Sequence, residues 1–230
     1  MNTSPFNPLG PAHFDSQKGE SGVPGRHSHR VAVLFATREG HAKRIAERIV
    51  FDLLSLGFDS DLLAVKRHLP FDLNHYSAAL LVASVHAGHH EKEMVRFVRD
   101  HKQELETIPT AFVSVTLSEA GAEMAEKSPA EHAQFVRDVD LMLGRFFCET
   151  RWLPSVAKPV AGALLYTHYN FLVRMVMKNI ARKAGASTDT SRDYDYTNWP
   201  DLDKFVGDFT ARLRIKQVEA STSTSAKPRL

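Results

Sequence analysis

The sequence predicts one α/β domain in which five parallel strands alternate with helices on both faces of a sheet. Three short runs are dominated by apolar residues, as strands covered on both faces are; they are residues 31–36, 78–84 and 110–115. Between these runs, apolar residues recur at helical spacing. Strands separated by helices form βαβ units with right-handed crossovers, and we expect a doubly wound sheet with the strand order 2-1-3-4-5.

The remaining elements follow from the same patterns. The first helix carries apolar residues from Ala42 to Leu54, and Gly57 stands where a C-cap belongs. A helical insertion is expected after the fourth strand, because residues 133–147 repeat apolar side chains at helical spacing. The other predicted elements are a weaker strand at 59–65, a helix from Met94 to Leu105, a fifth strand at 156–165, and helices near 168–183 and 201–213.

The two ends of the chain differ in composition from its centre. Residues 1–29 are rich in Pro, Gly, Ser and His, and residues 215–230 are rich in Ser, Thr and Lys. Such segments bury too little apolar surface to offset the entropy of ordering, so both are predicted to be disordered tails. The folded domain is expected to span 30–214.

Composition excludes several classes of function. The chain has 29 Lys and Arg against 27 Asp and Glu, so it lacks the strong positive charge that nucleic-acid binding favours. Cys148 is the single cysteine, which is typical of a reducing compartment. No apolar run approaches the roughly 20 residues that a spanning helix needs, and we find no signal peptide. We expect a cytoplasmic protein, soluble or attached to a membrane surface.

The loop after the first strand carries the first functional signal. In an open parallel sheet, ligands bind beyond the carboxyl ends of the strands, where the strand order reverses. The start of the following helix favours a phosphate, Thr37 and Arg38 add possible hydrogen bonds, and Gly40 permits a positive φ. A capping role for Thr37 and a turn at Gly40 would explain the loop equally well. No GxGxxG or GxxxxGK motif is present, so a dinucleotide site or a triphosphatase is not indicated.

Several motifs in order resemble the menaquinone-dependent protoporphyrinogen IX dehydrogenase family, whose members are flavodoxin-like, FMN-dependent protoporphyrinogen oxidases. Three of them look like that family's FMN loops, and four lie in the C-terminal third. The FMN-loop motifs are Thr37-Arg38-Glu39-Gly40, the residues 83–89 (ASVHAGH) and the residues 112–117 (FVSVTL). The C-terminal motifs are 161–166 (AGALLY), 175–178 (MVMK), 188–190 (TDT) and 196–199 (YTNW). Together the motifs cover about residues 30–213.

The resemblance implies an FMN enzyme of heme biosynthesis that oxidises protoporphyrinogen IX, or another small redox substrate, and passes electrons to a membrane quinone. By this resemblance the phosphate is lined by Thr37, Arg38, Glu39, Gly40 and His41. The flavin ring is flanked by Ser84, Val85, His86, Ala87 and Gly88 and by Ser114, Val115, Thr116 and Leu117. The stretch 118–151 matches the family's long insertion near the flavin, where substrate could enter.

Two departures from the family pattern keep other functions open. Ala36 and Ala42 stand where the flavodoxin pattern favours hydroxyl residues, and His86 and Ala87 replace an expected Arg and Tyr. A flavodoxin-fold domain that has lost FMN is therefore one alternative. A flavodoxin-type electron carrier is another, although a carrier usually presents a strongly acidic docking surface and this chain is nearly neutral.

The chemistry itself requires few side chains, because FMN supplies the hydride transfer. His86 and His89 are the candidate catalytic residues, since a histidine beside the flavin can stabilise its reduced form or move a proton; solvent-facing loop histidines are the alternative. We expect no metal site, because these histidines lack further ligands at a suitable spacing. The helix Phe171–Lys183 is apolar and basic, which is typical of contact with an anionic membrane or of a core helix with a solvated edge. Contact would place the protein at the inner face of the plasma membrane.

Overall fold

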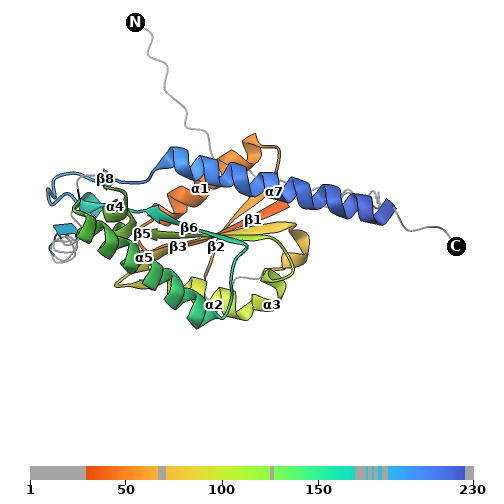
Figure 1. Cartoon of the computed structure of the whole chain (residues 1–230), viewed down its shortest axis with the longest axis horizontal. Helices are drawn as coiled ribbons and strands as arrows, with labels where there is room; N and C mark the ends of the chain where they lie inside the picture. Colours follow the sequence, from red (N-terminus) through yellow and green to blue (C-terminus); the bar gives the residue numbers. More distant parts are fainter. Residues whose placement is uncertain are drawn as a thin grey trace, which may run out of the picture.

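The computed structural model describes residues 30–66, 71–124, 127–168, 175, 178, 181–182 and 186–225, the last ten of these without their side chains. A parallel sheet forms its centre, in the order β2-β1-β3-β5-β6 (Figure 1). These strands are β1 (Arg30–Ala36), β2 (Asp59–Ala64), β3 (Ala78–His86), β5 (Thr110–Thr116) and β6 (Val156–Ala161). Counted along the chain, the parallel strands have the order 2-1-3-4-5, so the predicted topology is confirmed.

Helices cover both faces of this sheet (Figure 1). One face packs against α1 (His41–Ser55) and α7 (Trp199–Ser225), and the other against α2 (Lys92–Asp100), α3 (Lys102–Leu105) and α5 (Pro129–Thr150). Side chains alternate between the two faces along β1: Val31 and Val33 belong to the first apolar cluster and Ala32 and Leu34 to the second. All four are fully buried, which explains why this strand reads as an unbroken apolar run.

Short elements were the hardest to anticipate. The two-residue strand β4 (His89–His90) pairs antiparallel with the end of β3. The predicted fifth strand is interrupted at Gly162, after which β7 (Ala163–Leu164) pairs with β8 (Tyr194–Asp195) in a second, two-stranded sheet. Elements of two residues are too short to show a period in sequence. Two 3₁₀ turns, Leu73–His75 and Tyr166–His168, complete the described elements.

The helical insertion after the fourth parallel strand is confirmed. It consists of α4 (Leu117–Glu123) and the longer α5. The start of α5 has a capping box, in which the Ser128 hydroxyl accepts from the Glu131 N–H and the Glu131 carboxylate accepts from the Ser128 N–H, with Pro129 next in the chain. The residues of this capping box are visible in the sequence. They place the start of α5 at Pro129, four residues before the predicted start at 133.

The C-terminal helix is longer than predicted. Helix α7 runs to Ser225, so the expected helix end near 213 is wrong; residues such as Gln217 and Ala220 are good helix formers and continue the helix. The predicted N-terminal tail 1–29 lies outside the described residues, as do 226–230 and most of Phe171–Lys183. Among the helices that the structure describes, none combines the length and apolar character needed to cross a membrane.

The contact between α4 and α5 depends on a glycine. A Cβ added to Gly121 would lie 2.9 Å from the ring of Phe135. We expect Gly121→Ala to destabilise the fold by about 1–3 kcal/mol through overpacking, although alanine is the better helix former. Gly144→Ala on α5 is the matched control, because nothing lies within 4 Å of its Cβ position, and it should gain up to about 1 kcal/mol. Denaturant unfolding measures the free energy of unfolding of both variants. Equal gains in stability would contradict the close packing of Gly121 against Phe135.

Candidate functional site

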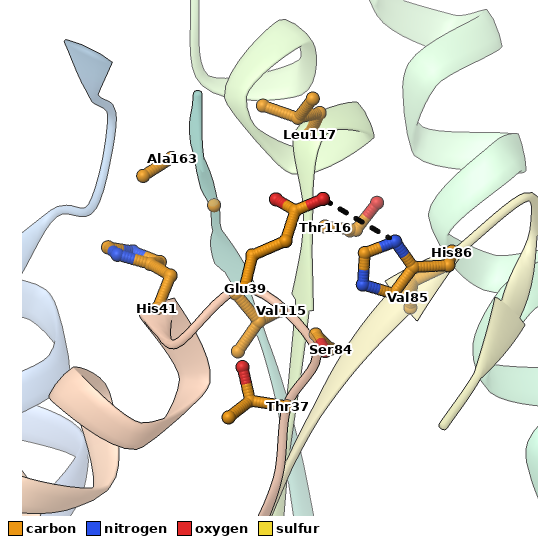
Figure 2. A pocket seen from close by; sticks show the side chains of 11 residues that line it. Thr37, Glu39, His41, Ser84, Val85, His86, Val115, Thr116, Leu117 and Ala163 are labelled. Atoms are coloured by element: carbon orange, nitrogen blue, oxygen red, sulfur yellow. Dashed lines mark ion pairs between the residues drawn. The ribbon is translucent and has the colours of Figure 1, made fainter. Parts of the chain in front are cut away.

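A pocket opens at the carboxyl ends of β1, β3 and β5 (Figure 2). The space between its walls is about 420 Å³, a figure that includes open solvent at the mouth. It is lined by Thr37, Glu39, His41, Ser84, Val85, His86, Val115, Thr116, Leu117, Gly162 and Ala163. The loops singled out in the sequence thus meet at one place. Gly162 and Ala163 were not among the predicted site residues, although they lie in a C-terminal motif of the resemblance.

Other predicted site residues lie beside the pocket rather than on its wall. Ser114 is fully buried, and its hydroxyl lies 2.8 Å from Nε2 of His90. Ala87 and Gly88 form the turn between β3 and β4, with φ of 50° and 78°. Arg38 has an exposed side chain and points to a buried carboxylate described below.

The start of α1 has features that favour the binding of an anion. Gly40 is its N-cap with φ of 94°, no side chain caps the helix, and its first turn contains no acidic residue. The hydroxyl of Thr37 accepts a hydrogen bond from the Gly40 N–H at 3.0 Å, which shapes the loop that leads into the helix. The N–H groups of the first turn and the positive end of the helix dipole therefore remain available to a phosphate.

His41 connects this helix start to the C-terminal part of the chain. Its Nε2 lies 2.8 Å from the hydroxyl of Thr197, which in turn donates to the carbonyl of Ala161 at 2.9 Å. Because the Thr197 proton is used in that second bond, Nε2 of His41 is the donor in the first. Burial lowers the pKa of His41, opposed in part by Asp195. A neutral imidazole therefore links the start of α1 to Thr197.

A buried carboxylate organises the opposite wall. Glu91 is 5% exposed. Its Oε2 accepts from Arg38 at 3.2 Å, and its Oε1 accepts from the Ser84 hydroxyl at 3.3 Å. Nε2 of His86 lies 3.2 Å from the same Oε1, an ion-pair distance at an angle that does not make a hydrogen bond. The other ring nitrogen, Nδ1, faces Oε1 of Glu39 at 4.0 Å (Figure 2).

The two candidate catalytic histidines are separated by the turn at residues 87–88. His86 lines the pocket, whereas His89 is exposed and does not line it. Arg145 of α5 donates to the carbonyl of Gly88 at 2.7 Å and lies 3.4 Å from Nε2 of His89. The insertion thus holds the hairpin in place from outside. Of the two histidines, only His86 is placed to act in the pocket.

The two alanines that depart from the flavodoxin pattern lie in the core. Ala36 is 4% exposed and Ala42 is fully buried, each within one of the two apolar clusters. Neither position presents a polar atom to the pocket. In the loop 37–40, the hydroxyl that lines the pocket is that of Thr37.

Comparison with known proteins agrees with this geometry. A family model described as a flavodoxin domain matches residues 32–191. A protein from Escherichia coli K12 named protoporphyrinogen IX dehydrogenase (quinone) is 30% identical over 177 residues, which are 77% of this chain and 92% of that protein. A Leishmania major protein of the same name is 29% identical over 202 residues, 87% of this chain and 83% of that protein.

Among solved structures, a flavodoxin mutant from Pseudomonas aeruginosa matches 80% of this chain and 99% of its own, at 16% identity and a TM-score of 0.45. That score is too low to support the fold assignment, which rests on the sheet order described above. The match of the family model over most of the folded region and the near-complete coverage of the Escherichia coli relative decide the assignment: the chain belongs to the flavodoxin-domain family, within the group of the quinone-linked protoporphyrinogen IX dehydrogenases.

Proposed function

We propose that this protein binds FMN and uses it to oxidise protoporphyrinogen IX with a quinone as the electron acceptor. The observation that carries this proposal is the pocket at the carboxyl edge, where the three loops after β1, β3 and β5 meet. This is the place where sheets of this order bind FMN. The substrate and acceptor follow from the names of the relatives.

The residues at the start of α1 fit the phosphate group of FMN. The uncapped first turn offers N–H donors and a favourable dipole, and Gly40 leaves nothing within 4 Å of its Cβ position. Thr37 and His41 flank this start and line the pocket. We therefore assign the phosphate to the loop 37–41, held mainly by backbone donors.

The remaining walls fit the flavin ring. Ser84 to His86 lie on one side of the pocket, Val115 to Leu117 on a second, and Gly162 and Ala163 on a third. Glycine and alanine leave room for a flat ring, and the apolar side chains exclude water from it. When bound there, FMN would accept a hydride from the substrate and pass the electrons to the quinone.

We assign Glu39 to the ring side of the pocket, whereas the resemblance implies a contact with the phosphate. Its carboxylate points across the pocket toward His86 and away from the helix start (Figure 2). A carboxylate beside a phosphate would repel it. The observed direction instead places the negative charge where the ring and the substrate would lie.

The quinone acceptor makes contact with a membrane surface a natural extension of this proposal. The sequence assigns that contact to Phe171–Lys183, of which Met175, Lys178, Ala181 and Arg182 belong to the described residues. Contact, and with it a location at the inner face of the plasma membrane, remains a prediction. Flotation with vesicles containing anionic lipid measures it, and a protein that stays at the bottom of the gradient would contradict it.

Two measurements on the purified protein test the proposal. After incubation with FMN and desalting, we expect the bands of oxidised flavin in the absorption spectrum. Under anaerobic conditions, we then expect protoporphyrinogen IX to yield fluorescent porphyrin only when a quinone is added. A colourless protein after desalting would favour the domain that has lost FMN. A yellow protein without quinone-dependent turnover would favour the electron carrier.

A further inference from the structure

Three acidic or basic side chains, those of Glu39, His86 and Glu91, form a line from the pocket to a buried carboxylate. Oε1 of Glu39 lies 4.0 Å from Nδ1 of His86, and Nε2 of His86 lies 3.2 Å from Oε1 of Glu91. The second carboxylate oxygen of Glu91 contacts Arg38, whose side chain is 63% exposed. Arg38 stays protonated and does not relay a proton, so the route to water is through Glu39 itself, whose side chain is 25% exposed.

The proposed oxidation must dispose of a proton in every two-electron step. When a porphyrinogen loses two hydrogens, the electron pair of a bridging C–H bond leaves as a hydride to the flavin. The proton of a pyrrole N–H leaves separately, and its electron pair joins the new conjugated double bond. The quinone finally takes up two electrons and two protons. A group in the pocket that accepts the N–H proton would lower the barrier of this step.

We propose that Glu39 is the catalytic base that takes this proton and releases it to water at the pocket mouth, and that the pair His86 and Glu91 positions Glu39 for this transfer. A carboxylate is a suitable acceptor for a pyrrole N–H. Imidazole can take up a proton at Nδ1 and release one from Nε2, because its two nitrogens exchange donor and acceptor roles. His86 can thus share a proton with Glu39 at Nδ1, while the carboxylate of Glu91 offsets the charge of the ring at Nε2.

The distances are compatible with transfer once the site is occupied. Nε2 of His86 lies 3.2 Å from Oε1 of Glu91, and the ring must turn to make the hydrogen bond that the present angle does not allow. The 4.0 Å gap between Glu39 and His86 is longer, and contacts of this kind commonly tighten in the complex or include one water. The Glu39 side chain is 25% exposed, so water can reach it.

The buried end of the line is held in place by its neighbours. The side chain of Glu91 is 6% exposed and contacts Ser84 and His86 at the end of β3 and Arg38 on the loop after β1. A buried carboxylate is costly unless it is paired, so these contacts explain how Glu91 is tolerated there. Glu91 and His86 act through Glu39 and are positioning residues in this scheme.

A matched set of variants tests the scheme in the full-length protein loaded with FMN. Glu39→Gln and Glu91→Gln remove a proton acceptor with little change in shape, and Glu93→Gln is the control, since Glu93 is exposed on α2. We expect Glu39→Gln to lower kcat by about 100-fold, the usual scale of general-base loss. The KM and the FMN dissociation constant should stay near the wild-type values. The loss for Glu91→Gln should be smaller, and Glu93→Gln should behave as wild type.

Two further readouts distinguish proton transfer from a structural role. Acetate in the buffer should restore part of the activity of Glu39→Ala, because a free carboxylate can take the place of the missing base. The ring ¹⁵N resonances of His86 are recorded by NMR before and after FMN is added. In both states they should differ from those of the wild type in Glu91→Gln and match them in Glu93→Gln. The second readout does not depend on turnover.

The outcomes separate this scheme from the function on which it rests. Absence of turnover in the wild-type protein would overturn the proposed function and the proton path together. Wild-type turnover with an undiminished kcat in Glu39→Gln would overturn the proton path alone. Failure of acetate to rescue Glu39→Ala would exclude Glu39 as the base. His86 resonances that do not change in Glu91→Gln would exclude Glu91 as a partner of His86.

Discussion

Replacing Gly40 by aspartate is expected to weaken FMN binding by about 100-fold. The new carboxylate would stand at the start of α1, where we place the phosphate. Two like charges about 4 Å apart repel by about 4 kcal/mol at an effective dielectric constant near 20, and solvent at the pocket mouth reduces this to about 2–3 kcal/mol. Fluorescence titration of FMN with the purified variant measures the change in the dissociation constant.

Two controls isolate the charge in this experiment. Gly40→Asn has nearly the same shape without the charge, and both Asn and Asp tolerate the positive φ of 94° better than other residues do. Gly57→Asp introduces the same residue at a φ of 80° after the end of α1, far from the pocket loops. Both should bind FMN much more tightly than Gly40→Asp. Equal affinities for the Asp and Asn variants at position 40 would exclude the phosphate from the helix start.

The protein is expected to lose stability in acid because of a histidine buried beside the pocket. His90 is 5% exposed, lies against the rings of Phe112 and Phe146, and contacts the hydroxyl of Ser114. Burial lowers its pKa to about 4, with a smaller contribution from His89. The unfolded chain therefore binds a proton below about pH 6.5 that the folded chain binds only near pH 4.

The sign and size of this effect follow from linkage. The contribution of His90 is fully present above about pH 6.5 and is lost as the pH falls to about 4, with a total of about 3 kcal/mol. Urea unfolding at a series of pH values should show His90→Gln less stable than wild type at pH 7, with a difference that shrinks in acid. His132→Gln, at an exposed position of α5, should track the wild type at every pH. A pH-independent difference for His90→Gln would mean that folding does not lower the pKa of His90.

The architecture could be predicted from the sequence because its signals are local. Strands such as β1 and β3 are buried on both faces, so nearly every position must be apolar, and the helices between them repeat apolar residues with their own period. Parallel strands end at one edge of the sheet, so the loops that follow β1, β3 and β5 had to lie together. The resemblance to the family used the same loops, and the place of the pocket followed from them.

The contacts that give the pocket its chemistry came only with the tertiary structure. The pair His41 and Thr197 is separated by 156 positions in the chain, and the pair Arg38 and Glu91 by 53. Glu91 follows a two-residue strand that leaves no periodic signal, so nothing in the local sequence marks it as buried. His86 and His89 look alike in the sequence, and the turn between them decides that only His86 lines the pocket. Apolar patterns are visible in the local sequence, because each position reflects its own burial. The partner of a buried charge depends instead on how distant segments pack together.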